Sequence, residues 1–408
     1  MDILIVSHFG STYSENDNDR FLYLAKSLDQ KNNVEIVTSS FCHEKKIHRN
    51  QTEVSWAKFA HPFKITFIEE PGYKKNVCLK RFYSHYIFGL NLYKYIKNRK
   101  KPDVIYCAVP SLTGPYLISR YCKKNKIKFI IDIQDLWPEA FKMVFDVPII
   151  KDIIFKPFEI MANSIYRKAD EIVAVSQTYI DRAMKVNKKL QQGCSVFLGT
   201  DLERYDENVK ENKIINQQKN VIRIGYCGTL GTSYDIKCVI DALKIISMKD
   251  SQSVQFIIMG DGPKKEEFEK YAKEKGVDCC FKGRVPYDEM CALIDSCDIV
   301  VNPITGGAAA SIINKHADYA ACGHPVVNSQ EANEYRKLVE EYDMGLNCEN
   351  GDAIDLATKL EALIEDKDLR CRMGMNARKC AEEKFNRKKT YVKIEKVILG
   401  EKLSESEL

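Results

Sequence analysis

The chain has 408 residues, of which 45% are hydrophobic and 29% are charged, and this length predicts two globular domains of ordinary size. No apolar run is long enough to span a bilayer, and the first residues, MDILIVSHFG, lack the basic segment of a signal peptide. We therefore expect neither a membrane-spanning segment nor a signal peptide, and the first residues are predicted to form a strand.

The net charge of +5 is unevenly distributed. Residues 1–200 contain 31 Lys and Arg against 20 Asp and Glu, whereas the remaining residues contain 31 against 37. A basic first half predicts an anionic partner for that half: an anionic membrane surface, a lipid diphosphate or a nucleic acid. The fifteen cysteines are scattered and form no paired C-x-x-C motif, so we expect reduced, mostly buried thiols in a cytosolic protein.

The first half of the chain alternates strands and helices. A strand is expected at Ile3–Ser7, followed by a loop through Gly10 and a helix over Asp19–Gln30 with helically spaced apolar residues. Further strands are expected at residues 34–38, 65–69, 104–108, 129–132 and 172–175, and a long helix at 81–98. This alternation predicts a parallel sheet covered on both faces by helices.

A polar stretch at residues 206–221 is rich in Lys, Asn and Gln and is expected to be a linker. The alternation then restarts, with strands at 223–226, 254–260 and 279–281, and helices at 235–247, 263–275 and from Pro286. Residues from Asp352 onward are charged and are expected to be helical. The sequence thus predicts two α/β units, whose ligands bind at the carboxyl ends of the strands.

The β-branched run Ile299–Asn302, ended by Pro303, is expected to form a strand. The stretch from Val301 to Asn328 then reads as strand, glycine-rich loop, helix and strand. The small residues around Gly307 leave room for a ligand, and Ser311 is expected to cap a helix that runs to Ala321. A helix N-terminus after such a loop attracts phosphate through its free N–H groups and its dipole.

Lys315 and Asp318 are three residues apart on this helix and are expected to share one face. A cation near a phosphate and a carboxylate near a ribose suit a nucleoside diphosphate. The alternative interpretation is an ordinary βαβ unit with a solvated helix face.

Seven segments, in order along the chain, resemble retaining glycosyltransferases of family 4, which have the GT-B fold. They are SHFG at 7–10, ADEIVAVS at 169–176, GTD at 199–201, GYCGTL at 225–230, IIMGDGP at 257–263, FKGRVPYDEM at 281–290 and NKHADYAACGHPVV at 314–327. The resemblance implies an α/β protein with two Rossmann-like domains that face a cleft. Residues 1–205 and a returning C-terminal helix, 385–408, would form the acceptor domain, and residues 206–384 the donor domain.

The resemblance also implies a nucleotide-sugar donor, a saccharide or lipid-linked acceptor, and neither a metal nor a cofactor. Asp318 falls where the family has the second glutamate of its E-x7-E motif, which holds the ribose. The other donor-binding positions that it implies are the backbone of Ile312, Ile313 and Asn314 at the diphosphate, Arg284 and Val285 near the nucleobase, Gly10 in the loop that approaches the transferred sugar, and Gly228, Gly260 and Gly307 in the donor loops.

The sequence departs from the family pattern at three positions. The first motif glutamate is replaced by Ala310, and the usual diphosphate-binding Arg and Lys are replaced by Thr229 and Tyr234. A subgroup of the family carries a lysine on the motif helix, and Lys315 is expected to supply the missing charge.

Asp135 lies just past the carboxyl end of the strand expected at 129–132 and is expected to face the cleft. It can orient or deprotonate an acceptor hydroxyl there, so Asp135 and Lys315 are the candidate catalytic residues. The alternative for Asp135 is an N-cap of the helix that begins near Pro138.

Two further patterns suggest metal binding only weakly. The D-x-D pattern from Asp17 to Asp19 precedes a helix, where capping is the favoured interpretation. Cys42, His43 and His48 have no fourth ligand at a suitable spacing, so a solvated basic loop is favoured.

The segment Lys74–Lys101 combines basic and aromatic residues, which suits an anionic membrane surface. The alternative is an amphipathic domain helix whose lysines extend along its rim. No recognised nucleic-acid module accompanies the segment, so nucleic acid is not expected as a partner.

Three classes of function therefore stay open. The leading prediction is a retaining glycosyltransferase, hexosyl or N-acetylhexosaminyl, acting in surface-polysaccharide synthesis at the cytoplasmic face of the membrane. The alternatives are a nucleotide-sugar 2-epimerase, which needs several acid–base side chains, and a non-catalytic nucleotide-binding subunit, which Ala310 favours.

Overall fold

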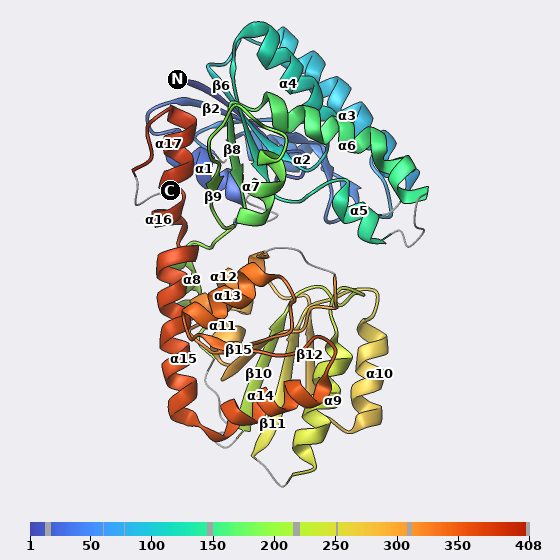
Figure 1. The fold of residues 1–408 in the computed structure, drawn as a ribbon, viewed down its shortest axis with the longest axis vertical. Coiled ribbons are helices and arrows are strands. Elements are labelled where there is room, and N and C mark those ends of the chain that lie inside the picture. The colour runs from blue at the N-terminus through green and yellow to red at the C-terminus, as the bar shows by residue number, and fades with distance from the viewer. Residues whose placement is uncertain are drawn as a thin grey trace. The chain divides into compact units, whose positions relative to one another are not determined.

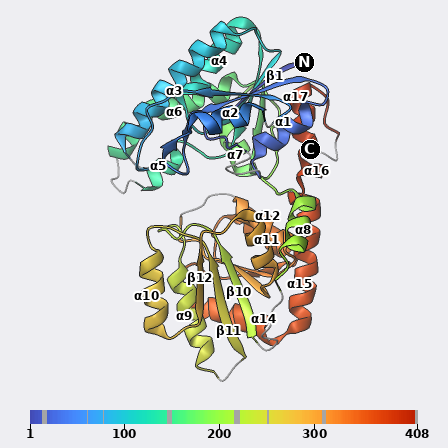
Figure 2. The same ribbon diagram turned by 180° about the vertical axis from the view of Figure 1, so that it is seen from behind.

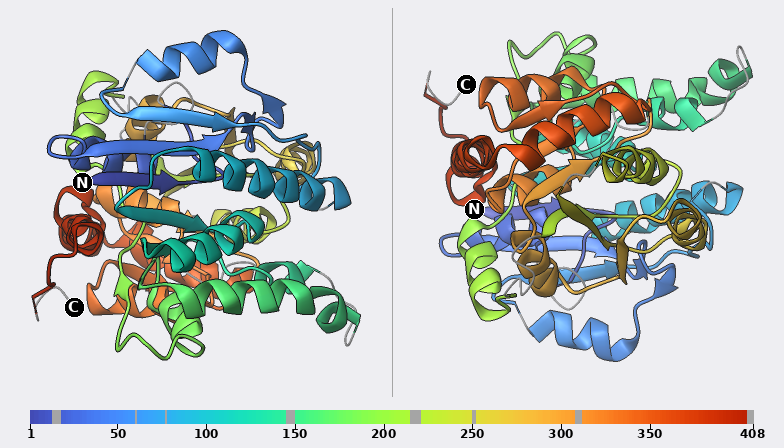
Figure 3. Two further views of the ribbon diagram at one scale, coloured as in Figure 1. Left: turned by 90° about the horizontal axis from the view of Figure 1, so that it is seen from above. Right: turned by 90° about the horizontal axis from the view of Figure 1, so that it is seen from below.

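The structure is a computed structural model that describes residues 1–12, 18–59, 61–76, 78–144, 150–214, 221–249, 252–307 and 312–404. Two compact α/β units are present: unit 1 comprises Met1–Val196 with Tyr391–Leu408, and unit 2 comprises Phe197–Thr390. Helices cover both faces of each sheet, as Figure 3 shows. Among the described residues, no helix combines the length and apolar character needed to cross a bilayer.

Unit 1 is built on a seven-stranded parallel sheet with the strand order β5-β2-β1-β6-β7-β8-β9 (Figure 1). The strands are β1 (Asp2–Val6), β2 (Asn33–Ser39), β5 (Lys64–Ile68), β6 (Val104–Val109), β7 (Lys128–Ile133), β8 (Glu171–Ala174) and β9 (Cys194–Ser195), and β3 (Phe41–Cys42) pairs with β4 (Ile47–His48) in a hairpin. The helices are α1 (Arg20–Leu28), α2 (Gln51–Phe59), α3 (Leu79–Asn98), α4 (Thr113–Asn125), α5 (Glu139–Val144), α6 (Ile150–Lys168), α7 (Gln177–Met184) and α17 (Val392–Leu399).

Unit 2 has a six-stranded parallel sheet with the order β12-β11-β10-β13-β14-β15. The strands are β10 (Val221–Cys227), β11 (Ser253–Met259), β12 (Cys279–Gly283), β13 (Ile299–Asn302), β14 (Val326–Asn328) and β15 (Gly345–Asn347). The helices are α8 (Leu202–Glu211), α9 (Ile236–Ser247), α10 (Lys265–Lys275), α11 (Tyr287–Asp295), α12 (Asn314–Ala321), α13 (Asn333–Glu341), α14 (Ala353–Glu365), α15 (Lys367–Cys380), the π-helical turn η1 (Ala381–Phe385) and α16 (Arg387–Thr390). The expected pair of parallel α/β units is confirmed.

The unit boundaries differ from the expected ones at 205/206 and 384/385. Helix α8 explains the first difference, because its Leu202 and Tyr205 belong to the apolar core of unit 2. Residues Asp206–Glu211, which the sequence assigned to a linker, are part of this helix. Phe385 lies in the same core, so the chain leaves unit 2 only after α16.

Helix α17 returns to unit 1, as expected, and lies beside α1 (Figure 2). Its Ile394 and Ile398 are fully buried in one apolar core with Phe21 and Leu24 of α1. The returning segment therefore completes the core of unit 1.

A buried ion pair ties the returning segment to the sheet of unit 1. Arg20 Nε donates to Asp132 Oδ2 over 2.8 Å, and Tyr106 Oη donates to the same oxygen over 2.7 Å. The Arg20 guanidinium also donates to the Val196 carbonyl at 3.1 Å and to the Tyr391 hydroxyl at 3.4 Å. Since buried charges persist only when they are paired, these contacts fix α1 against β6, β7 and the start of α17.

All fifteen cysteines are free thiols, and most of them are buried. Asp19 caps α1, because its carboxylate accepts the N–H groups of Phe21 and Leu22 at 2.7 and 3.1 Å. This finding favours the capping interpretation of the D-x-D pattern, whose Asp17 lies outside the described residues.

Candidate functional site

The glycine-rich stretch of unit 2 lies at the carboxyl end of β13, where the sequence predicted a phosphate site. Gly307 adopts a left-handed backbone with a φ of 70°, and its N–H donates to Glu331 Oε2 at 3.0 Å. Ala310 and Ser311 lie outside the described residues. The expected end of the helix at Ala321 is correct, but the helix begins at Asn314, and the N-cap position is Ile313, not Ser311.

His316 accepts a hydrogen bond from a backbone N–H group that the sequence analysis assigned to the diphosphate. The Ile313 N–H donates to His316 Nδ1 at 3.2 Å, so this N–H faces the protein interior and not an anion. The His316 ring is fully buried and stacks on Tyr335 with a centroid distance of 3.4 Å. Burial holds the pKa of His316 well below its usual value, which keeps the ring neutral and able to accept this bond.

The remaining backbone candidates differ in their surroundings. Ile312 places its side chain in the apolar core of unit 2, whereas Asn314 is exposed at the start of α12. Of Ile312, Ile313 and Asn314, Ile313 thus uses its N–H group in a hydrogen bond within the protein. Ile312 and Asn314 remain candidates for backbone contacts to the diphosphate.

Lys315 is buried beneath the loop that follows β10. Its ammonium lies 4.4 Å from the ring centroid of Tyr226 and 3.8 Å from that of Tyr234. Within the described part of the chain, Lys315 Nζ is buried without a hydrogen-bond acceptor. Burial lowers the pKa of Lys315 to about 7.

Two aromatic faces therefore hold a cation that has no anionic partner among the residues that the structure describes. A cation–π contact compensates only part of the free-energy cost of desolvating an ammonium group. A buried, unpaired ammonium beside a loop at a strand's carboxyl end is the arrangement that an anionic ligand would complete.

The glycines of the neighbouring loops are required by close packing. A Cβ at Gly228 would lie 2.7 Å from Lys315 Nζ, and a Cβ at Gly260 would lie 1.8 Å from the Gly228 carbonyl oxygen. The Gly228 N–H donates to the Met259 carbonyl at 2.9 Å. Gly228 therefore leaves the space that the Lys315 side chain needs, and Gly260 brings the two loops together.

Asp318 points to a different set of groups from Lys315, although both lie on α12. Tyr287 Oη donates to Asp318 Oδ1 at 2.8 Å and lies 2.9 Å from Thr200 Oγ1. Burial raises the pKa of Asp318 to about 6, and the Tyr287 hydrogen bond opposes this shift. Lys315 and Asp318, which the sequence predicted to share one helix face, thus contact two separate groups of side chains: Lys315 contacts Tyr226 and Tyr234, and Asp318 contacts Tyr287.

The candidates for the nucleobase follow β12. Arg284 is exposed, and Val285 packs against the apolar core of unit 2. Both lie at the carboxyl end of the sheet, on the same edge as Gly228 and Gly260.

In unit 1, Asp135 follows the carboxyl end of β7 and is half-buried. Its carboxylate accepts the Trp137 indole N–H at 3.0 Å and the Leu136 N–H at 2.9 Å. Burial raises the pKa of Asp135, and these two hydrogen bonds oppose the shift. The carboxylate is therefore anchored by its own loop and does not cap α5.

Gly10 lies in the loop after β1, as predicted. Its carbonyl accepts from Thr38 Oγ1 at 3.1 Å and from Arg49 Nη2 at 2.9 Å. This loop is thus tied to the end of β2 and to the residues that precede α2.

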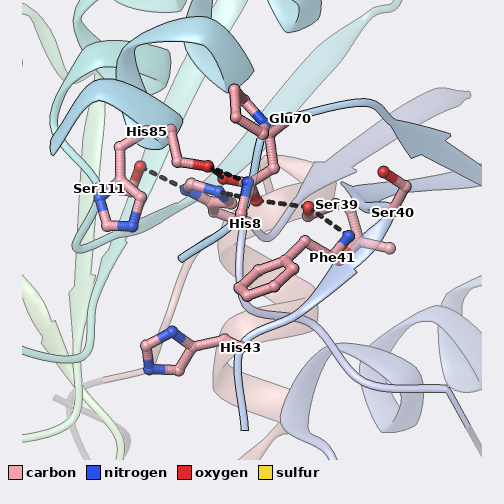
Figure 4. A network of polar contacts seen from close by, with 12 residues as sticks. His8, Ser39, Ser40, Phe41, His43, Glu70, His85 and Ser111 are labelled. Atoms are coloured by element: carbon pink, nitrogen blue, oxygen red, sulfur yellow. Dashed lines mark hydrogen bonds and ion pairs between the residues drawn. The ribbon is translucent and has the colours of Figure 1, made fainter. Parts of the chain in front are cut away.

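A buried polar network that the sequence did not reveal supports the same loop (Figure 4). His8 Nε2 lies 2.8 Å from Glu70 Oε1, and His8 Nδ1 lies 2.6 Å from Ser111 Oγ. Ser39 and Ser84 donate to the two oxygens of Glu70 at 2.5 Å each. Glu70 thereby joins the ends of β1, β2, β5 and β6 at the carboxyl edge of the sheet.

In the described part of the chain, no group of three or more His, Cys, Asp and Glu residues is arranged to hold a metal. Among the weak candidates, His43 instead contacts the Tyr73 hydroxyl through Nδ1. Burial, reinforced by the nearby Lys46, lowers the pKa of His43 to about 3.

Most of the residues around α12 lie within a recognised domain. Residues 207–380 match the family of glycosyl transferases group 1. This domain is contained in unit 2 and includes Gly228, Tyr234, Tyr287, Lys315 and Asp318. The matched region therefore contains Lys315 and Asp318 with their tyrosine partners, whereas Thr200 lies before it.

An uncharacterized glycosyltransferase of Methanocaldococcus jannaschii is 23% identical to the chain over 238 residues. The match covers 57% of the chain and 59% of that relative's length.

Two solved structures resemble the whole chain. The Anabaena protein HepE, solved with UDP, has a TM-score of 0.72 and 17% identity, and the match covers 98% of this chain and 100% of HepE. A sucrose-phosphate synthase from Thermosynechococcus elongatus also has a TM-score of 0.72, with 14% identity and 98% of each chain covered. These similarities establish the GT-B fold.

Proposed function

We propose that the protein is a retaining glycosyltransferase. It would transfer a hexosyl or N-acetylhexosaminyl group from a nucleoside-diphosphate sugar to a hydroxyl of a saccharide or polyprenyl-linked acceptor. The observation that carries this proposal is the buried ammonium of Lys315, unpaired among the described residues and located in a glycosyltransferase domain.

In this proposal Lys315 contacts the diphosphate. Leaving of the sugar concentrates negative charge on the diphosphate, and a pre-positioned cation stabilises that charge more strongly in the transition state than in the ground state. Tyr226 and Tyr234 hold the ammonium in place before the donor binds. HepE was solved with UDP and with UDP-glucose, which supports a donor of this chemical class.

Asp318 would bind the ribose, together with Tyr287. The other donor-binding residues of the proposal are Gly10, Gly228, Gly260, Arg284, Val285, Gly307, Ile312 and Asn314. Ile313 remains in this set because it lies between Ile312 and Asn314, although its N–H group donates to His316. The reaction would use no metal, because a cationic side chain takes the place of one at the diphosphate.

Asp135 would orient or deprotonate the acceptor hydroxyl in unit 1. Its half-buried carboxylate is fixed by Trp137 and lies at the carboxyl end of the sheet, where α/β proteins bind ligands. We place the enzyme in surface-polysaccharide synthesis, in the cytoplasm at the inner face of the plasma membrane. The basic first half of the chain and the likeness to family 4 support this placement.

Incubation with a radiolabelled nucleotide sugar and a polyprenyl-diphosphate sugar tests the proposal. A ligand screen by thermal shift, in which the correct donor raises the melting temperature, first identifies the donor. Transfer of label to the lipid, with the anomeric configuration of the donor retained, is the expected result. An epimerised donor would indicate a 2-epimerase, and binding without turnover would indicate a non-catalytic subunit; either outcome overturns the proposal.

A further inference from the structure

Helix α3 of unit 1 exposes an apolar stripe along its outer side. Four residues, spaced by four, three and four positions, lie on this stripe: Leu79, Tyr83, Tyr86 and Leu90. This spacing places them on one face of a helix, over a length of about 16 Å. The side chain of Leu79 is the most exposed, with 87% of its surface accessible.

Helix α6 continues the apolar surface. Ile153, Ile154 and Ile160 are exposed, and 70% of the surface of Ile153 is accessible. Phe82 of α3 and Phe158 of α6 are in contact, with ring centroids 5.3 Å apart, which brings the two helices together. Helix α4 packs against both, so the three helices cover the same face of the sheet (Figures 1 and 2).

Basic residues flank the α3 part of this surface. Residues 74–101 contain nine Lys and Arg and no Asp or Glu. Exposed Lys94 and Lys97 continue the α3 stripe beyond Leu90 at the same helical spacing. On α6, Glu159 is neutralised by Lys156 at 3.3 Å, so it does not offset the positive charge.

We propose that the exposed sides of α3 and α6 dock together on an anionic lipid bilayer. We call the seven apolar residues named above the docking surface. An apolar helix face with aromatic residues, continued by lysines, is the pattern of a helix that lies in the bilayer interface. A nucleic acid would be attracted by the lysines but would gain nothing from exposed leucine and isoleucine side chains.

The lysines and the apolar side chains have different roles in this docking. Long-range attraction from Lys94, Lys97 and their neighbours brings unit 1 to anionic lipid, and this attraction weakens as salt rises. Leu79, Ile153 and Ile154 then enter the boundary between headgroups and acyl chains, which salt does not oppose. The purpose of the docking rests on the proposed function, because a polyprenyl-linked acceptor is presented at such a surface.

The test measures sedimentation of the full chain with vesicles of phosphatidylcholine, with and without an equal part of phosphatidylglycerol. We expect binding only to the anionic vesicles. The triple variant Leu79→Ser, Ile153→Ser and Ile154→Ser should weaken the vesicle partition coefficient by about tenfold or more, since each change exposes less apolar surface for burial in lipid.

A matched control makes the same kind of substitution, from an exposed apolar residue to Ser, on unit 2. The triple variant Met248→Ser, Ile354→Ser and Met375→Ser changes side chains of comparable exposure, 69–75%, outside the docking surface. This variant should bind vesicles as the unmodified chain does. Equal loss of binding in both triple variants would overturn the proposal.

Charge reversal measures the electrostatic contribution to vesicle binding. Lys94→Glu, Lys97→Glu and Lys100→Glu together should weaken binding by about a hundredfold or more, from roughly fivefold per lysine removed. Reversal of exposed Lys270, Lys273 and Lys367 in unit 2 should leave vesicle binding unchanged.

Failure of the docking and failure of the proposed function are distinguishable. The stabilisation of the protein by UDP and the transfer to a water-soluble acceptor should be unaffected in the Leu79, Ile153 and Ile154 variant. No binding to anionic vesicles at low salt overturns the docking alone. The docking proposal is also overturned if light scattering shows a dimer that the Leu79, Ile153 and Ile154 variant abolishes, because the surface would then bind a second copy of the chain.

Discussion

The ammonium of Lys315 lies 3.8 Å from the ring centroid of Tyr234. By the resemblance to family 4, Tyr234 falls at the position of a diphosphate-binding lysine. The cation thus comes from helix α12, and the residue that replaces the usual lysine binds it through an aromatic face. We propose that this exchange compensates for the departure of the sequence from the family pattern.

Replacement of Lys315 by Ala should lower the turnover number by about tenfold to a thousandfold, the range for loss of one pre-positioned donor to a developing anion. Steady-state kinetics with the identified donor measures it. Lys337→Ala, an exposed lysine on α13, is the control and should retain full turnover. Near-normal turnover in Lys315→Ala, with losses in Thr229 or Tyr234 variants, would place the phosphate site elsewhere.

Binding of the nucleoside diphosphate of the identified donor should weaken as the pH rises through the pKa of Lys315, about 7. The diphosphate attracts the protonated amine, so the free protein must take up a proton before or during binding once the pH exceeds that value. Titration calorimetry between about pH 7.5 and 9, where the phosphate itself is fully ionised, should show a dissociation constant that rises with pH. In Lys315→Met this dependence should disappear.

Lys315→Met should also stabilise the ligand-free protein near pH 7. The pKa of Lys315 is lowered on folding, so between about pH 7 and 10.5 the unfolded chain binds more protons, and stability rises with pH. The cost of the buried amine is therefore greatest at and below pH 7, where the variant should gain on the order of 2–4 kcal/mol. Urea unfolding at pH 6.5 and 10 checks whether the gain shrinks at the higher pH, and an equal gain at both would contradict burial of the charge.

Asp318→Asn should mainly raise the Michaelis constant for the donor and leave turnover nearly unchanged. Contacts to the ribose change little during the reaction, so they contribute equally to the ground state and the transition state. Tyr287→Phe removes the 2.8 Å hydrogen bond to Asp318 and should shift the same constant in the same direction. A large loss of turnover in Asp318→Asn would instead assign this carboxylate to the chemical step.

Arg20→Met should destabilise unit 1 by about 3–5 kcal/mol, because Asp132 would remain buried without its cation. The double variant Arg20→Met with Asp132→Asn removes both charges and should recover part of this loss. Urea unfolding, followed by tryptophan fluorescence, measures the effect, because Trp56 and Trp137 both belong to unit 1. No recovery in the double variant would show that lost packing, and not the unpaired charge, causes the instability.

Much of the fold could be predicted from the sequence. The expected strand at residues 299–302 coincides with β13, because a β-branched run ended by Pro303 leaves little choice. The expected linker at 206–221 was wrong in its first part, because polar composition hides an amphipathic helix whose Leu202 and Tyr205 face the core of unit 2. Whether such a segment forms a helix or a linker depends on its burial by residues that are distant in the sequence.

The site was less accessible to sequence reasoning. Lys315 and Asp318 were found because they belong to one continuous motif. The partners Tyr226, Tyr287 and Thr200 could not be found, since their roles arise only when separate loops meet in the fold. His316 lay inside the motif, yet its capture of the Ile313 N–H depends on a stacking contact with Tyr335.

The return of α17 to unit 1 has a consequence for synthesis on the ribosome. All of unit 2, residues 197–390, emerges after most of unit 1 and before the helix that completes its core. The apolar side of α1 around Phe21 and Leu24 therefore stays uncovered while nearly two hundred residues are translated, about 10–40 s at typical elongation rates. The unit that begins to fold first is the last to be finished, and its uncovered apolar side is where we expect a chaperone of nascent chains to bind.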